Sequence, residues 1–176
     1  MTAFIETATT PSVADVVITP ARSRDLPALL ELHHRCSPES LRFRYLSAYV
    51  PDEATLRSML AKTETLVAWY RDRVVAMGNL SLNGDVAELA LLVDDEWQGR
   101  GLGGRLGDLL AAVAVQRGAT TMSATTAGGN RRVHRLMAHI GMDPQVEYVS
   151  GTAYVTCTLP GARSASPSRA VRSVPC

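Results

Sequence analysis

The sequence predicts one mixed α/β (α+β) domain in which helices flank a central sheet. Strand-like and helix-like stretches follow one another in the order strand, helices, three strands, helix, strand, helix, strands, which suits a layered fold. The pair Asn83-Gly84 is a strong hairpin signal between two of the three consecutive strands. A glycine-rich loop, residues 98–104, then leads from the third of these strands into a helix.

Length and composition are those of a single globular domain. The chain has 176 residues, which suits one domain with a sizeable core. Its 46% apolar and 20% charged residues are ordinary for such a protein. We expect a flexible arm over residues 1–14, one domain over 15–159, and a disordered tail rich in Ser, Pro, Ala and Arg over 160–176.

Charge and apolar runs argue against several classes of function. The net charge of +1 carries no global signature of nucleic-acid binding. No apolar run approaches the roughly 20 residues of a membrane helix. The first ten residues contain no basic residue and do not resemble a signal peptide, so a cytoplasmic location is expected. The three cysteines show no metal-ligand spacing, and no metal is expected.

The first half of the chain predicts one strand and three helices. The β-branched run at residues 16–19 is the first strand. Ser23 ahead of Asp25, and then Ser37 ahead of Pro38, are helix start signals. The expected helices cover residues 25–35, 38–46 and 52–60.

The second half predicts a meander of strands followed by alternating helices and strands. The period changes to that of strands over residues 65–70, 74–82 and 86–93. Glycines at 118 and 141 end two helical stretches. The remaining elements are expected as helix 106–115, strand 120–126, helix 130–140, and strands 146–149 and 152–159.

The glycine-rich loop is a candidate anion cradle. A helix N-terminus offers unpaired N–H groups with partial positive charge, and glycines let a ligand approach the backbone closely. Gly99, Gly101 and Gly104 also satisfy the dinucleotide pattern G-x-G-x-x-G. That fold needs an acid about 20 residues further on, and Asp108 comes too early and Asp143 too late.

Two other types of loop share this richness in glycine. A nucleotide-binding loop that ends in Gly-Lys-Ser/Thr is excluded, because Arg105 follows Gly104. A purely structural glycine turn stays open. A nicotinamide-dependent enzyme is disfavoured by the missing ribose-binding acid.

The residues around this loop resemble a known family. The segment from Val93 to Gly103, Val-Asp-Asp-Glu-Trp-Gln-Gly-Arg-Gly-Leu-Gly, is similar to motif A of the GNAT superfamily of N-acetyltransferases, Gln/Arg-x-x-Gly-x-Gly/Ala. Asn130 and Gly141 resemble its next motif, Asn…Gly-Phe. The resemblance implies a mostly antiparallel mixed sheet with one parallel, splayed strand pair. It also implies an N-acetyltransferase that uses acetyl-CoA as co-substrate and no metal.

The resemblance also implies which residues bind the cofactor. The end of the third strand would pair its backbone with the pantetheine arm, the loop would hold the pyrophosphate by backbone N–H groups, and Asn130 would touch the cofactor. These residues are Leu91, Leu92, Val93, Gln98, Gly99, Arg100, Gly101, Leu102, Gly103, Gly104 and Asn130. The arginine that meets the 3′-phosphate stays open among Arg100, Arg105, Arg131 and Arg135.

Glu88 is the candidate general base. Acetyl transfer needs a neutral amine, whereas a free alkyl amine is mostly protonated near neutral pH. Glu88 is the only acid in strand 86–93, and a carboxylate among apolar residues is desolvated. Its context resembles that of the base in bacterial protein-lysine acetyltransferases. A solvent-facing strand position is the alternative, and a bulge would decide between the two faces.

The general acid departs from the family pattern. Many relatives carry a tyrosine seven residues after the motif asparagine, where this chain has Met137. The thiolate would then leave without that acid, or another group would serve, and His134 is one candidate. A catalytically silent acetyl-CoA-binding module is therefore an alternative to the enzyme.

The acceptor is expected to be an amine, either a small molecule or a protein lysine. The stretch from Cys36 to Tyr45 resembles one in a subgroup that includes the bacterial lysine acetyltransferases. Glu39 and Tyr45 are the candidate acceptor-binding residues, although Glu39 could equally serve the first turn of its helix. Aminoglycosides and other small amines stay open as acceptors. No nucleic-acid or membrane partner is expected, and a homodimer is one open form of assembly.

Overall fold

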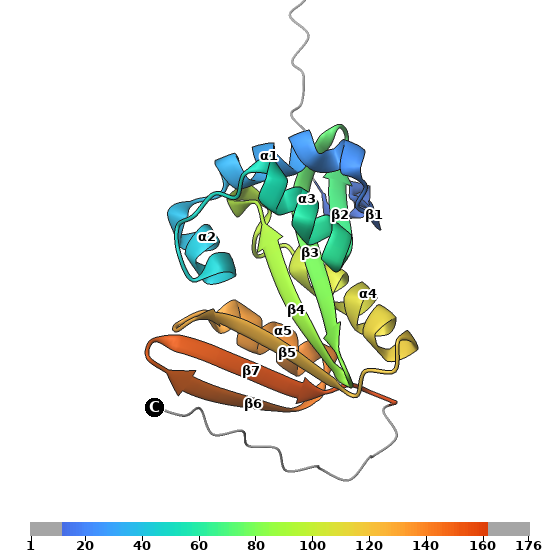
Figure 1. Ribbon diagram of the computed structural model, residues 1–176, viewed down its shortest axis with the longest axis vertical. Coiled ribbons are helices and arrows are strands. Elements are labelled where there is room, and N and C mark those ends of the chain that lie inside the picture. The colour runs from blue at the N-terminus through green and yellow to red at the C-terminus, as the bar shows by residue number, and fades with distance from the viewer. Residues whose placement is uncertain (1–11, 162–176) are drawn as a thin grey trace, which may run out of the picture.

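A computed structural model describes residues 12–161 of the protein (Figure 1). The expected tail from residue 162 on and the expected arm before residue 12 lie outside this range. The helices are α1 (Leu26–Arg35), α2 (Pro38–Tyr45), α3 (Glu53–Lys62), α4 (Leu102–Gln116) and α5 (Arg131–Ile140). The strands are β1 (Val17–Pro20), β2 (Glu64–Tyr70), β3 (Arg73–Asn83), β4 (Val86–Val93), β5 (Thr121–Ala127), β6 (Met142–Val149) and β7 (Thr152–Thr158). Short 3₁₀ turns cover Val13–Asp15, Ser23–Asp25 and Asp95–Trp97.

The strands form one seven-stranded sheet in the order β1-β2-β3-β4-β5-β7-β6. Every neighbouring pair is antiparallel except β4 and β5, which are parallel. That parallel pairing covers only residues 86–88 of β4 and 121–123 of β5. Beyond it the two strands diverge, as the V between β4 and β5 in Figure 1 shows. The predicted mixed sheet with one parallel, splayed pair is confirmed.

Helices cover both faces of the sheet and define two sides of the core. Leucines of α1, α2 and α3 pack with Val67, Met77 and Leu92 on one face. Helices α4 and α5 pack on the other face, against β4, β5 and β7. None of the helices within residues 12–161 is long and apolar enough to cross a membrane.

The facing of β4 is set by its unbroken pairing with β3. The register runs from Ala76↔Val93 to Asn83↔Val86 without a shift. Ala87 and Leu89 therefore enter the core under α4 and α5, while Leu92 enters the core under α1. Glu88 lies on the same face as Leu92, because strand side chains alternate. It is exposed, so the burial and desolvation expected for it are wrong.

Most expected boundaries agree with the observed ones within two residues, but two elements begin four residues early and the hairpin turn is shifted by one residue. Helix α4 begins at Leu102 instead of residue 106, because the helix continues through glycines that carry no apolar stripe. Strand β6 begins at Met142 instead of residue 146, since a register shift between Met142 and Gln145 lets it pair past Pro144. The hairpin turn consists of Gly84 and Asp85, because Asn83 still pairs with Val86.

Gly141 is required by close packing between α5 and β7. A Cβ atom at this position would lie 2.3 Å from Cys157 Sγ and 2.8 Å from Thr158 O. The Thr158 carbonyl belongs to the sheet and cannot move aside cheaply. We expect Gly141→Ala to lower the free energy of unfolding by about 1–3 kcal/mol, the usual cost of overpacking.

Urea denaturation checks this expectation, and Gly104→Ala is the matched control. A Cβ at Gly104 meets nothing within 4 Å. Alanine is also favoured over glycine in a helix by about 1 kcal/mol. Equal stability of the Gly141→Ala variant and the unmodified protein would contradict the packing role.

Candidate functional site

A cavity of about 430 Å³ opens where β4 and β5 separate. Its walls are residues 89–93 of β4 and 124–126 of β5, both immediately after the paired segments. The N-terminal end of α4 and one face of α5 close the cavity at one end, and α2 contributes to it from the other side of the sheet. The further lining residues are Ser40, Phe43, Arg44, Trp97, Gln98, Gly99, Gly101, Leu102, Gly103, Gly104, Asn130, Arg132, Val133, Arg135, Leu136 and His139.

The glycine loop places a helix N-terminus at this cavity. Gly99 and Gly101 have φ values of 74° and 87°, a left-handed conformation that favours glycine. Gly101 is the N-cap of α4, and its carbonyl accepts the N–H of Arg105 at 3.1 Å. The N–H groups of residues 102–104 therefore belong to the first turn, which has no helical acceptors for them. Since these residues line the cavity and the turn holds no acid, they suit an anion.

The side chain of Gln98 serves the fold of this loop. Its amide donates to Ser40 Oγ at 2.8 Å and to Val93 O at 3.0 Å. The Gln98 side chain thereby joins the loop to α2 and to the end of β4. The backbone of the loop, rather than this side chain, is left to face a ligand.

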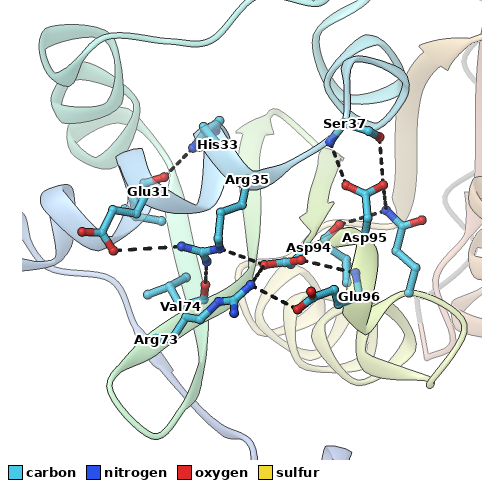
Figure 2. Close-up of polar contacts among 12 residues, drawn as sticks. Glu31, His33, Arg35, Ser37, Arg73, Val74, Asp94, Asp95 and Glu96 are labelled. Atoms are coloured by element: carbon cyan, nitrogen blue, oxygen red, sulfur yellow. Dashed lines mark hydrogen bonds and ion pairs between the residues drawn. The ribbon is translucent and has the colours of Figure 1, made fainter. Parts of the chain in front are cut away.

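Asp95 makes the second connection between the loop and α2 (Figure 2). Its carboxylate accepts the N–H of Ser37 at 2.7 Å, and the hydroxyls of Ser37 and Ser40 at 2.8 Å each. Burial raises the pKa of Asp95, but the hydrogen bonds from Ser37 and Ser40 outweigh it, so that the pKa lies below its usual value. The start of α2 is thus held against the segment that leads into the glycine loop.

Asp94, the residue before Asp95, connects the same loop to α1 and β3. Its carboxylate is buried and lies 3.0 Å from Arg35 Nε and 2.7 Å from Arg73 Nη2 (Figure 2). Arg35 also donates to Val74 O at 2.5 Å. The end of α1, the start of β3 and the start of the loop meet at this carboxylate. From the sequence alone, Asp94 and Asp95 have no predicted structural role beyond membership of the motif, because their hydrogen-bond partners lie far away in the sequence.

Asn130 lies at the cavity wall as the N-cap of α5. Its Oδ1 accepts the N–H groups of Arg132 at 3.2 Å and Val133 at 3.4 Å. Its Nδ2 donates to Thr126 Oγ1 at 2.9 Å, and that hydroxyl donates to Phe43 O at 2.8 Å. The motif asparagine therefore ties α5, β5 and α2 together beside the cavity.

The four arginines considered for the 3′-phosphate lie in different places. Arg135 lines the cavity, as does Arg132, which was not among the four. Arg105 donates to the carbonyl of Val13, and the Arg100 guanidinium lies over the Trp97 ring at 5.4 Å. The face of α5 that carries Arg132 and Arg135 is therefore the cationic wall of the cavity.

The two residues expected to bind the acceptor do not lie in the cavity wall. Glu39 and Tyr45 are not among the described residues that line the cavity. Glu39 is exposed at the start of α2, and Tyr45 is half-buried at its end. Phe43 and Arg44, which sequence reasoning passed over, bring α2 to the cavity instead. A half-buried arginine on a short helix has no signal in the sequence.

Neither His134, the candidate general acid, nor Met137, which occupies the position of the family's acid, is part of the cavity wall. Met137 is fully buried in the core between α5 and the sheet. His134 packs against Tyr148, with 6.2 Å between the ring centroids.

His33 fixes the hydroxyl of Tyr45. The buried ring donates from Nδ1 to Leu29 O at 2.6 Å, which leaves Nε2 to accept the Tyr45 hydroxyl at 2.6 Å. This arrangement requires the neutral ring. Burial lowers the pKa of His33 below its ordinary value of 6.5, and the charges of Arg44 and His34 add to this.

The lowered pKa of His33 predicts an acid-dependent loss of stability. Below about pH 6.5 the unfolded chain takes up a proton at this ring more readily than the folded chain. The free energy of unfolding should fall with decreasing pH there, by at most about 1.4 kcal/mol per pH unit from this residue. His33→Gln should show a shallower fall in urea titrations between pH 7 and 5. Identical slopes in the two proteins would contradict the assignment.

Comparison with known proteins agrees with this geometry. The profile of the Acetyltransferase (GNAT) family matches residues 26–142. No curated protein sequence matches the chain significantly.

Solved structures share the fold. The GNAT domain of S. lividans PAT aligns with a TM-score of 0.72 and 22% identity over 81% of this chain and 89% of that one. A phosphinothricin acetyltransferase from Sinorhizobium meliloti in complex with AcCoA aligns with a TM-score of 0.71 and 19% identity, over 88% of this chain and 94% of that one. YncA from Salmonella typhimurium, an acetyltransferase structure with its cofactor acetyl-CoA, aligns with a TM-score of 0.67 and 21% identity, over 88% of this chain and 99% of that one. Because the family profile spans more than half of the sequence, the chain belongs to the Acetyltransferase (GNAT) family.

Proposed function

We propose that the protein is an acetyl-CoA-dependent N-acetyltransferase that moves the acetyl group directly to a primary amine, with Glu88 as general base. The observation that carries the proposal is the cavity at the separation of β4 and β5. There residues 89–93 of β4 still pair with β3 but have no partner on the β5 side, and the N-terminus of α4 lines the same space. Two of the structural neighbours were solved with acetyl-CoA, which supports the same ligand here.

Two parts of the cavity wall suit two parts of the cofactor. The N–H groups of the first turn of α4 would hold the pyrophosphate, and the unpaired edge of β4 would bind the pantetheine arm. Leu91, Leu92 and Val93 supply that edge, and Asn130 lies beside it. Backbone N–H groups near the thioester would stabilise the oxyanion of the tetrahedral intermediate.

Glu88 supports the proposed chemistry through its position rather than through burial. It is the last residue of β4 that pairs with β5, so it lies at the point where the cavity begins. Its exposure lets an incoming ammonium reach it, directly or through water. Met137 supplies no acid, so the thiolate would leave without a side-chain proton from that position.

Ligand-dependent stabilisation and an amine panel together test the proposal. Acetyl-CoA at 100 times its Kd should stabilise the protein by about 2.7 kcal/mol, whereas NAD should not stabilise it. Release of free CoA thiol should then follow addition of at least one amine from a panel of amino acids, lysine peptides, polyamines and aminoglycosides. Stabilisation by NAD alone would contradict the proposal.

A catalytically silent acetyl-CoA-binding protein is the second candidate. The buried Met137 in the position of the family's acid favours it. The amine panel separates the two, because the silent protein would be stabilised by acetyl-CoA and would release no thiol with any amine.

A further inference from the structure

Arg44 is a half-buried cation in the wall of the cavity that the proposed chemistry does not use. It lies near the C-terminal end of α2, a helix that contacts β4, and Leu89 and Ala90 of β4 line the same cavity. Arg44 lies close enough to Glu88, the proposed general base, for their charges to interact. Arg44 is therefore placed where the amine acceptor of the proposed reaction would bind.

The guanidinium is held in place by neutral groups. Its Nη2 donates to Asn79 Oδ1 at 2.9 Å, and the buried Asn79 amide in turn donates to Thr65 Oγ1 at 2.7 Å. The Arg44 Cζ atom also lies 4.7 Å from the centre of the Tyr45 ring. These contacts orient the group without neutralising it, because an amide oxygen and an aromatic ring carry no net charge.

The remaining hydrogen-bonding capacity of Arg44 is unused. Its Nε atom is buried and has no hydrogen-bond partner. Within residues 12–161, no carboxylate forms an ion pair with Arg44, and only Nη2 donates a hydrogen bond. Burial lowers the pKa of Arg44, and the fields of Tyr45 and Glu88 oppose that effect. An arginine stays charged in a protein, and a desolvated charge is costly unless an anion pairs with it.

Glu88 provides the opposite charge at the same place. It is close enough to act on Arg44 electrostatically, yet the two groups form no ion pair. A cation and an anion held apart beside one cavity are complementary to a zwitterion. A compound with an amine next to a carboxylate would place its carboxylate on Arg44 and its amine toward Glu88.

We infer that the acceptor is a small amine that carries a carboxylate beside the reacting nitrogen, as α-amino acids do, and that Arg44 binds this carboxylate. The inference rests on the proposed acetyltransferase function. A lysine side chain, a polyamine or an aminoglycoside brings positive charge without the adjacent anion. Arg44 would repel such acceptors and stay unpaired in their complexes.

Matched pairs of acceptors test this assignment. Each L-α-amino acid of a panel is compared with its own α-amino amide, which lacks the carboxylate charge and has a less basic amine. The difference in amine basicity is the same for every variant, so the change in the acid-to-amide ratio on substitution reports the role of Arg44. Thiol release with acetyl-CoA gives kcat/KM for both. We expect the unmodified protein to prefer the acid by about 10- to 100-fold, the worth of a charge-assisted hydrogen bond. Arg44→Gln should abolish that preference.

Arg42→Gln is the control for Arg44→Gln. Arg42 lies on the same helix, is exposed, and does not line the cavity. It should keep the acid-to-amide ratio unchanged. This ratio is measured within one preparation, so it does not depend on how much of a variant is folded. Arg44→Lys keeps the charge and should retain part of the preference.

The outcomes distinguish this inference from the proposed function. Equal turnover of acids and amides by the unmodified protein, or a preference for lysine peptides, would overturn the role of Arg44 and leave the acetyltransferase intact. An unchanged acid-to-amide ratio in Arg44→Gln would do the same. Stabilisation by acetyl-CoA with no thiol release from any amine would overturn the proposed function, and this inference with it.

Discussion

Glu88→Gln is expected to lower kcat by about 10²- to 10⁴-fold, the usual contribution of general base catalysis. Glutamine keeps the size of the side chain and cannot accept the proton that the ammonium must lose. Glu88 is exposed, so the substitution should change the free energy of unfolding by less than about 0.5 kcal/mol, as surface changes usually do. Acetyl-CoA binding should be unaffected, since Glu88 is not among the cavity-lining residues.

Thiol-release kinetics and calorimetric titration with acetyl-CoA separate these two effects. Glu147→Gln is the matched control, because Glu147 is an exposed glutamate on the edge strand β6. The control should retain both kcat and affinity. An unchanged kcat in the Glu88 variant would remove Glu88 from the mechanism, and a parallel loss of acetyl-CoA affinity would show that the substitution disturbs the cofactor site instead.

The elements of this fold could be predicted because each rests on local signals. Helix α1 follows from its leucine spacing, and β3 and β4 follow from strand-like runs separated by a turn. The anion cradle is local too, since Gly99 and Gly101 adopt left-handed conformations and the helix begins directly after them. Boundaries failed where the signal was not local, as in β6, whose start depends on pairing with β7.

The environment of the candidate site could not be predicted in the same way. Glu88 was expected to be buried because its neighbours along the strand are apolar. Its exposure depends instead on which parts of β4 the helices leave uncovered, and that is a property of packing. The same reason hid Arg44, whose place in the cavity wall requires α2 to reach across the sheet toward β5.

Asp94→Ala is expected to lower the free energy of unfolding by about 2–4 kcal/mol. Removing one partner of a buried ion pair usually costs 3–5 kcal/mol, because it leaves an uncompensated charge. Asp94 is 3% exposed at its side chain and serves two cations, Arg35 and Arg73. The Arg73 side chain is 39% exposed and can recover part of its hydration, so we place the expected cost below the upper end of that range.

Glu96→Gln is the control, because it removes a carboxylate that also pairs with Arg73 but is exposed instead of buried. Glu96 also pairs with Arg73, at 3.4 Å, but its side chain is 73% exposed. Exposed pairs contribute only about 0–1 kcal/mol, so this variant should unfold in urea almost as the unmodified protein does. A similar loss in both variants would mean that the charge of Arg73, rather than the buried junction at Asp94, governs stability.

The position of Asp94 makes this loss of stability a functional matter as well. The Asp94 N–H donates to Val75 O at 3.0 Å, and its carbonyl accepts the Trp97 N–H at 2.8 Å, so the residue fixes how the chain leaves β4 for the glycine loop. Without the carboxylate, α1 and β3 lose their common attachment to that loop. We therefore expect Asp94→Ala to weaken acetyl-CoA binding although Asp94 does not line the cavity, and Glu96→Gln to leave it unchanged. Titration of both variants with acetyl-CoA at a temperature where each is folded decides whether the buried junction positions the cradle or only stabilises the domain.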